Sequence, residues 1–159
     1  MIDERPTTPL VIRLANTEDI ALIDELDTFS ASPTRNIARD MQKYFGSVDP
    51  STHERTLIFL GEVEGVVAAK AELMVPSSVS HPDVGSAVGY VKRVVVHPDY
   101  RGQGLSRKLM EHVIDYARNE LGLDGIDLHV WESNVPAIRL YESLGFQLQH
   151  RELYFRLQL

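Results

Sequence analysis

Two glycines lie between an apolar strand and an amphipathic helix, and their spacing predicts an anion-binding site. The strand ends with Val94-Val95-Val96, the turn contains Gly102 and Gly104, and a helix is expected from Gly104 onward. The first backbone N–H groups of a helix have no intrahelical partners and lie at the positive end of its dipole. Because glycine has no Cβ, such a turn can approach a phosphate or diphosphate closely. Arg101 and Arg107 flank the glycines, where they could add charge-assisted hydrogen bonds.

Other phosphate-binding loops fit this turn poorly. The sequence contains no G-x-x-x-x-G-K-[ST] run, which a Walker A loop requires. A dinucleotide-binding G-x-G-x-x-G pattern would need a third glycine where Arg107 stands. A tight strand-to-helix turn without a ligand also accounts for two glycines. The residues of the turn therefore leave both interpretations open.

A second pattern further along the chain favours the ligand-binding interpretation. The segment from Asn134 to Phe146 resembles the N-x-x-A-x-x-x-Y-x-x-x-G-F signature of the GNAT acetyltransferases. The segment Arg101-Gly102-Gln103-Gly104-Leu105-Ser106 resembles the R/Q-x-x-G-x-G/A loop of the same family, and the preceding Val96-His97-Pro98-Asp99-Tyr100 is its usual lead-in. One departure is Ser106, which is small but is neither glycine nor alanine. The resemblance covers the chain in detail from Ala87 onward.

The resemblance implies a GNAT-like α/β fold in a single domain over residues 1–159, with residues 1–9 as a flexible N-terminal segment. In this fold a mixed central sheet is flanked by helices, and two neighbouring parallel strands splay apart to hold acetyl-CoA. The amides from Gly102 to Arg107 would hold its diphosphate, and Tyr141 would lie near its sulfur. The implied cofactor-binding residues are Val94, Val95, Val96, Arg101, Gly102, Gln103, Gly104, Leu105, Ser106, Arg107, Asn134 and Tyr141.

The implied reaction is direct attack by an amine on a thioester, and its proton transfers need side chains. A lysine-like amine has a pKa of about 10.4, so only about one molecule in a few thousand is neutral at pH 7. The site must accept that proton or desolvate the ammonium. The leaving thiolate needs a proton in return. Tyr141 is the candidate donor because a phenol stays protonated at neutral pH, although a tyrosine here could also simply pack its ring.

The general base is the least defined part of this site. Many relatives carry a carboxylate on the strand before the glycine loop, whereas this strand reads Tyr90-Val91-Lys92-Arg93. Glu72 and Glu132 are the other candidates, either directly or through a water, although the simpler interpretation of each is a solvated surface charge. His129 alternates with apolar neighbours on a strand, so its side chain could face the site or solvent. No histidine lies at a metal-ligand spacing from an acidic residue in the sequence, so no metal is expected.

The elements that must position these residues follow from the hydrophobic pattern. Apolar and alternating runs predict strands, and apolar residues at helical spacing predict four helices. Arg35 and Tyr44, in the second helical region, could border the acceptor site. The expected strands cover residues 10–14, 56–60, 66–75, 87–96, 126–131, 146–148 and 153–157, and the expected helices cover residues 17–29, 35–45, 104–121 and 134–144.

Composition limits the class of partner. The chain has no cysteine, so it has neither disulfides nor a cysteine nucleophile. Its net charge of −7 argues against nucleic acid as a partner. Five basic side chains between Lys92 and Lys108, against Asp99 alone, instead suit a small polyanion. No run of residues is apolar enough to span a membrane, and the N-terminus lacks a secretory signal, so a cytoplasmic location is expected.

Two function classes stay open on the sequence. The first is an N-acetyltransferase that moves the acetyl group of acetyl-CoA to a primary amine of a small molecule, peptide or protein. The second is a module that binds CoA without turnover, which the basic residue at Lys92 would explain. The sequence also allows a homodimer.

Overall fold

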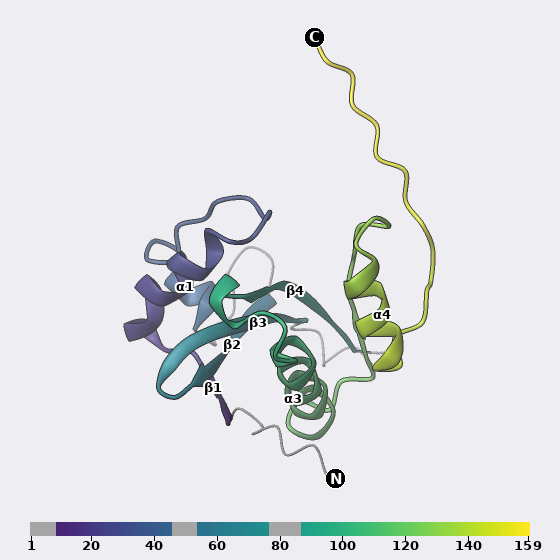
Figure 1. Ribbon diagram of the computed structural model, residues 1–159. Helices are drawn as coiled ribbons and strands as arrows, with labels where there is room; N and C mark the ends of the chain where they lie inside the picture. The colour runs from purple at the N-terminus through teal and green to yellow at the C-terminus, as the bar shows by residue number, and fades with distance from the viewer. Residues whose placement is uncertain (1–8, 46–53, 77–86) are drawn as a thin grey trace. The chain divides into compact units, whose positions relative to one another are not determined.

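The computed structural model describes residues 9–45, 54–76 and 87–159 (Figure 1). The chain divides into two compact units, residues 1–129 and 130–159, which are described separately. The predicted flexible segment at residues 1–9 lies almost entirely outside the described residues.

The first unit contains one mixed sheet with the strand order β1-β2-β3-β4-β5. The first four strands are antiparallel, and β5 is parallel to β4. This arrangement confirms the predicted α/β class with a mixed central sheet. The strands are β1 (Leu10–Leu14), β2 (Glu54–Val63), β3 (Val66–Pro76), β4 (Val88–Val96) and β5 (Gly125–Asp127).

The β2–β3 hairpin forms because its turn residues accept a left-handed backbone. Glu64 and Gly65 both have positive φ, 50° and 79°. They connect the paired residues Val63 and Val66. A tight hairpin turn whose twist matches that of antiparallel strands needs two residues with positive φ. Both arms are largely buried, which makes this hairpin the centre of the sheet.

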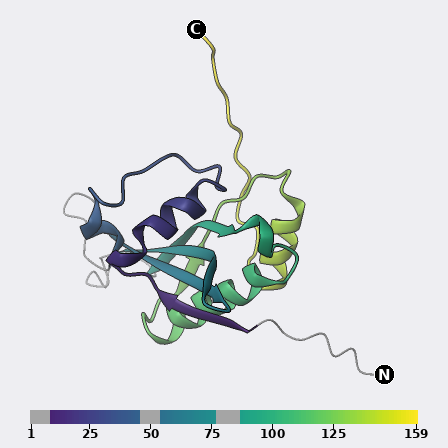
Figure 2. The ribbon, with the colours of Figure 1, turned by 60° about the vertical axis from the view of Figure 1, so that its left-hand side comes forward.

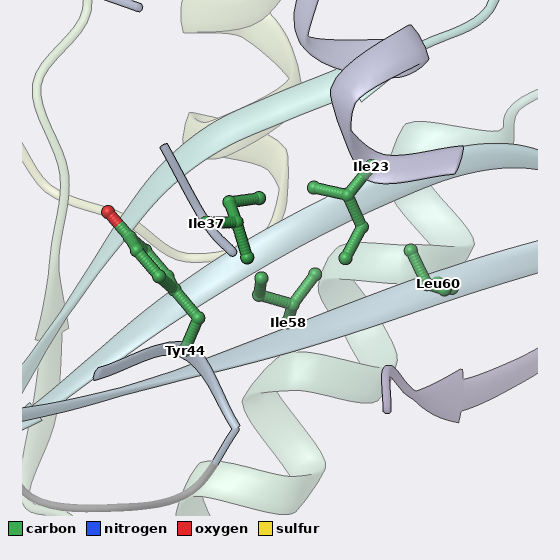
Figure 3. Packing of buried hydrophobic residues seen from close by; sticks show 5 residues of the cluster. All are labelled: Ile23, Ile37, Tyr44, Ile58 and Leu60. Carbon is green, nitrogen blue, oxygen red and sulfur yellow. The ribbon is translucent and has the colours of Figure 1, made fainter. Parts of the chain in front are cut away.

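Helices cover both faces of the sheet (Figures 1 and 2). On one face, α1 (Ile20–Asp27) packs through Ile23 onto Ile58 of β2 in a buried cluster (Figure 3). On the other face, Phe59 packs its ring against Tyr116 of α3 (Leu105–Asn119), with centroids 5.2 Å apart. Ile58 and Phe59 are neighbours on one strand, so their side chains point to opposite faces. The cluster under α1 also contains Ile37, Tyr44 and Leu60.

The predicted helix at residues 35–45 is mostly wrong. Only α2 (Met41–Tyr44) is helical, and residues 37–40 form turns. The Asn36 side chain accepts from the backbone N–H of Arg39 at 3.0 Å, and its carbonyl oxygen accepts from the N–H of Asp40 at 3.1 Å. Asn36 therefore caps a turn at residues 37–40, and regular helix begins only at Met41.

The second unit contains one helix, α4 (Val135–Ser143). Its start is capped by Asn134, whose side chain accepts from the N–H of Ala137. At its end Gly145 has a φ of 100°, and the N–H of Phe146 donates to the carbonyl of Tyr141. Both ends agree with the sequence prediction.

Three predicted strand regions differ from the structure. The strand expected at residues 126–131 is shortened to β5, which ends at Asp127. The strands expected at residues 146–148 and 153–157 are absent, because residues 146–159 form neither helix nor strand. Phe155 and Leu157 of this segment are highly exposed. A strand needs a neighbour to pair its backbone groups, and the second unit offers no other strand.

Candidate active site

The glycine turn ends at the start of α3, where the N-cap residue is a glycine and offers no capping side chain. Gly102 and Gly104 have φ values of 80° and 74°. Gly104 is the N-cap of α3 and has no side chain to accept from the first amides of the helix. Among the described residues, no atom lies within 4 Å of a Cβ placed on either glycine. This open, electropositive turn fits a diphosphate such as that of CoA.

The side chains of the turn contribute in different ways. Leu105 is buried and anchors α3 to the core, so its contribution to a ligand is its backbone N–H. The Nε of Arg101 donates to the carbonyl oxygen of Val96 at 3.3 Å, which fastens the turn to the end of β4. Arg107 forms an ion pair with Glu111 one turn along α3. In the same turn Gln103 is exposed and Ser106 is half-buried.

β4 and β5 are paired only over a short distance. Their register runs from Val88 opposite Gly125 to Tyr90 opposite Asp127. β4 then continues to Val96, while β5 ends. From Val91 onward, the edge of β4 on the side of β5 therefore has no strand partner among the described residues. This is the splay that the sequence resemblance implies, and it includes Val94, Val95 and Val96.

β4 contains a bulge in the middle of this edge. Lys70 pairs with Val95 and Glu72 pairs with Lys92, so β4 holds one residue more than β3 between the two pairs. Arg93 lies within the bulge with a φ of 52°, an uncommon conformation for a side-chain-bearing residue. Its carbonyl oxygen lies 3.3 Å from Nζ of Lys70. The peptide bond to Val94 is trans, so the Val94 N–H points away from Lys70.

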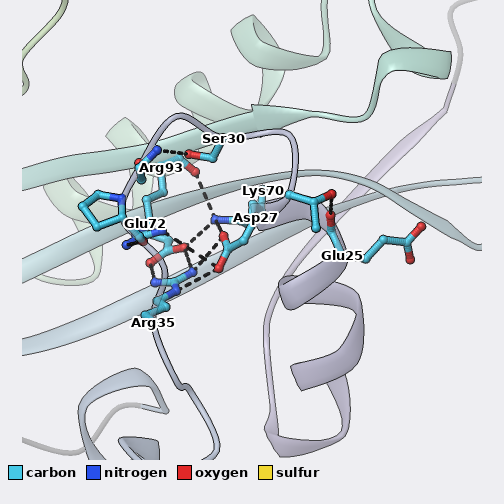
Figure 4. A network of polar contacts seen from close by, with 10 residues as sticks. Glu25, Asp27, Ser30, Arg35, Lys70, Glu72 and Arg93 are labelled. Carbon is cyan, nitrogen blue, oxygen red and sulfur yellow. Dashed lines mark hydrogen bonds and ion pairs between the residues drawn. The ribbon is translucent and has the colours of Figure 1, made fainter.

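A buried ionic network supports this bulge from the α1 face (Figure 4). Both oxygens of Glu72 accept from Arg35 at 2.5 Å, and one also accepts from Lys70 at 2.6 Å. Asp27, at the end of α1, pairs with Lys70 and Arg35 at 2.9 Å. Lys70 and Glu72 are fully buried. The surface-charge interpretation of Glu72 is therefore wrong, and its contacts favour a structural role.

Burial and charge shift the titration of the groups in this network. Burial alone would raise the pKa of Asp27, but the hydrogen bonds and charges of Lys70 and Arg35 outweigh it and hold that pKa below its usual value. Burial lowers the pKa of Lys92, which the charge of Glu72 only partly offsets. Arg35 also stacks on the ring of Tyr44, 4.8 Å from its centroid. Both predicted acceptor-site residues are thus largely buried, Tyr44 in the hydrophobic cluster and Arg35 in the network.

Tyr90 and His129 meet where β4 and β5 separate. The phenol oxygen of Tyr90 lies 2.6 Å from Nδ1 of His129. Tyr90 is opposite Asp127 in the register, and His129 lies two residues further along the chain. The sequence left the orientation of His129 open, and this hydrogen bond shows that it faces Tyr90. No sequence signal identified Tyr90 as its partner.

The second unit carries the remaining predicted site residues. Burial raises the pKa of the Tyr141 phenol above its usual value. Tyr141 also packs edge-on against Phe146 at 5.7 Å. Glu132 is highly exposed and lies 3.8 Å from Arg151. Trp131, next to Glu132 in the chain, is 71% exposed.

Comparison with known proteins places the chain in a family. The sequence profile of the Acetyltransferase (GNAT) family matches residues 20–146, so the chain belongs to this family. The chain is an acyl-CoA-dependent N-acetyltransferase, and its cofactor is acetyl-CoA. Among the described residues, no helix has both the length and the apolar character that crossing a membrane requires.

Individual relatives differ in how much of the chain they match. Glucosamine 6-phosphate N-acetyltransferase of Trypanosoma brucei brucei is 28% identical over 87% of this chain and 85% of its own length. The ribosomal protein bS18-alanine N-acetyltransferase of Escherichia coli K12 is 51% identical, but over 33% of this chain and 35% of its own. A crystal structure of a Trypanosoma brucei acetyltransferase matches 94% of this chain and 100% of its own, with 26% identity and a TM-score of 0.65. The CoA complex of aminoglycoside N-acetyltransferase AAC(6')-Iy has the same fold, with a TM-score of 0.72 at 17% identity over 95% of this chain and 96% of its own.

Proposed function

We propose that this enzyme acetylates the primary amine of an amino sugar phosphate. A relative that matches 87% of this chain is named for glucosamine 6-phosphate, whereas a relative named for the alanine of a ribosomal protein matches 33% of it. The buried ionic network adds a second argument. Its two carboxylates, Asp27 and Glu72, meet four cations: Arg35, Lys70, Arg93 and, through its charge interaction with Glu72, Lys92. This excess of positive charge favours an acceptor that carries a phosphate over a purely cationic amine. A peptide or protein amine is the second candidate.

The cofactor role of the glycine turn rests on the open space at its two glycines and on the glycine N-cap of α3. Acetyl-CoA supplies the acetyl group as a thioester. The amides from Gly102 to Arg107 bind its diphosphate, and Arg101 adds charge at the turn. The edge of β4 from Val94 to Val96 offers backbone groups to the pantetheine arm, as an added strand would use them. Asn134 holds the start of α4 and contributes to cofactor binding from there.

Tyr141 is the proposed proton donor to the departing thiolate. The donor must remain protonated until the thiolate forms, and the raised pKa of Tyr141 keeps its phenol protonated at neutral pH. The bulge at Arg93 directs the N–H of Val94 away from Lys70, and we propose that this N–H stabilises the charge that develops on the acyl oxygen. A cytoplasmic location, a homodimer and the absence of a nucleic-acid partner stay predictions from the sequence.

The test is a panel of acceptors. The protein is mixed with acetyl-CoA and glucosamine 6-phosphate, glucosamine, an alanine-initiated peptide or an aminoglycoside, and free thiol is followed with time. We expect the highest kcat/KM for glucosamine 6-phosphate, and a lower value for glucosamine because it lacks the phosphate. A preference for the peptide would move the acceptor to the second candidate. Tight binding of acetyl-CoA with no thiol release on any amine would instead support a CoA-binding module.

A further inference from the structure

Lys92 projects from β4 onto the face of the sheet that α1 covers. It is paired with Glu72 in the β3–β4 register, and register partners on antiparallel strands point to the same face. Glu72 accepts from Arg35 and Lys70, and Lys70 also pairs with Asp27 at the end of α1 (Figure 4). Lys92 therefore lies on the same face as the buried ionic network.

The network leaves the ammonium group of Lys92 without a counter-ion of its own. Glu72 already accepts from Arg35 and Lys70. Among the described residues, none forms a hydrogen bond or an ion pair with Lys92, although its side chain is half-buried. Charges that lose water in a protein are normally paired. Lys92 is therefore available to an anion from outside the chain.

Positive charge surrounds Lys92. Burial lowers its pKa, the charge of Glu72 partly offsets this effect, and the charges of Lys43, Arg93 and Arg35 lower the pKa further. Lys43 belongs to α2 and is half-buried as well. Like charges that lie together repel one another, and a bound anion removes that repulsion. The group therefore favours a ligand with more than one negative charge, such as a phosphate monoester.

The two arginines beside Lys92 are held by the protein itself. Arg35 is shared between Asp27 and Glu72. Arg93 donates to a backbone carbonyl oxygen at 2.7 Å and lies 4.0 Å from Asp27. Lys92 is thus better placed than either arginine to bind a ligand.

Lys92 also lies close to the place where the acyl group is expected. Val94, whose N–H is proposed to stabilise the acyl oxygen, follows Lys92 by two residues, at most about 7 Å along the strand. In glucosamine 6-phosphate the amine is on C2 and the phosphate is on C6, across the sugar ring. An acceptor whose amine attacks the acyl carbon next to Val94, and whose ring extends over the α1 face, brings its phosphate to Lys92.

We propose that Lys92, assisted by Lys43, binds the phosphate of the acceptor and thereby selects a phosphorylated amino sugar over the free amino sugar. The inference rests on the proposed acetylation of an amino sugar phosphate. It gives a function to the basic residue of β4 that stands where many relatives carry a carboxylate. In this scheme Lys92 determines specificity and transfers no proton.

Binding of an unreactive ligand tests the contact without turnover. Glucose 6-phosphate carries the phosphate but no amine, so it reports on the phosphate site alone. In calorimetry with CoA present, we expect Lys92→Met to raise the Kd for glucose 6-phosphate about tenfold or more, and Lys43→Met to raise it less. Lys92→Arg keeps the positive charge and should lose less affinity than Lys92→Met. Arg118→Gln is the matched control, because it removes a cation from α3 on the opposite face of the sheet, and it should bind as the wild type does.

Kinetics on two amines tests the selectivity. The ratio of kcat/KM for glucosamine 6-phosphate to that for glucosamine should fall about tenfold or more in Lys92→Met, and it should keep its wild-type value in Arg118→Gln. The thermal midpoint of Lys92→Met should be no lower than that of the wild type, because burial and the neighbouring cations disfavour the charge of Lys92. Loss of a structural cation would lower that midpoint.

The failure of this site and the failure of the proposed acceptor give different results. A wild-type enzyme that prefers glucosamine 6-phosphate, with the same ratio and the same Kd for glucose 6-phosphate in Lys92→Met, would overturn the role of Lys92 and keep the acceptor. A wild-type enzyme with equal kcat/KM for the two amines and no affinity for glucose 6-phosphate would overturn the proposed acceptor, and the phosphate site with it.

Discussion

Nζ of Lys70 lies 3.3 Å from the carbonyl oxygen of Arg93, the residue of β4 that adopts a left-handed backbone. A fully buried ammonium is costly unless it is paired, and Lys70 is paired with both Asp27 and Glu72. The ionic network therefore supports the bulge through Lys70. The bulge in turn fixes the direction of the Val94 N–H along the open edge of β4.

Replacement of Lys70 should lower both the stability of the folded protein and its activity. Lys70→Met leaves Glu72 buried with one cation fewer, and the loss of a partner in a buried pair costs about 3–5 kcal/mol. We expect a clear drop in the free energy of unfolding, measured with urea, and a lower kcat in the folded fraction. Arg39→Met is the control. It removes an exposed ion pair with Asp40 and should change neither quantity. Equal unfolding midpoints for wild type and Lys70→Met would contradict the role of the network.

A side chain at Gly104 should weaken CoA binding by more than backbone strain alone explains. Gly104→Val blocks backbone approach to the diphosphate and strains a residue with a φ of 74°. We expect its affinity for CoA to fall at least tenfold in calorimetry. Gly65→Val is matched, because Gly65 has a similar φ of 79° but lies in the β2–β3 turn. It should cost stability and leave CoA affinity unchanged, and a comparable loss of affinity in both variants would remove the turn from the binding site.

Arg101 should contribute to CoA binding through charge. Arg101→Ala removes one charge-assisted hydrogen bond, worth about 1–3 kcal/mol, or about 5- to 150-fold in Kd. The loss should shrink as salt is added, because an exposed ionic contact is screened. A Kd for CoA that stays the same at low salt would exclude a contact between this side chain and the diphosphate.

Tyr141→Phe should separate binding from turnover. Without the phenol proton the leaving thiolate has no donor, and we expect kcat to fall by about 10²- to 10⁴-fold, while the Kd for acetyl-CoA stays close to wild type. Tyr154→Phe serves as the control, since Tyr154 is exposed and donates no proton in this scheme. If kcat survived in Tyr141→Phe, another group would have to protonate the thiolate.

Acid should destabilise the protein partly through Asp27. The pKa of Asp27 is lower in the folded protein than its usual value of 3.8. Its contribution to stability is therefore complete above that usual value and is lost as the pH falls below it, through the lowered pKa. Unfolding free energies measured from pH 6 down to about pH 2 should fall more steeply for wild type than for Asp27→Asn. Parallel pH dependences would show that Asp27 is not held in its charged form by Lys70 and Arg35.

The sequence predicted the glycine turn and α3 well because their signals are local. The helix pattern placed α3 within two residues of its observed ends and α4 within one residue of its ends. The ion pairs of Glu72 could not be predicted in the same way. Its partner Arg35 is far away in the sequence, in a segment without regular structure, so no spacing links the two residues. The bulge gave no signal either, since Arg93 is not a residue type that favours positive φ.

The central claim is that the amides at the start of α3 bind the diphosphate of CoA. A crystal structure of the complex measures this directly. We expect diphosphate oxygens within about 3.2 Å of backbone nitrogens between Gly102 and Arg107, with the pantetheine arm along Val94 to Val96. CoA bound elsewhere, with this turn empty, would contradict the account.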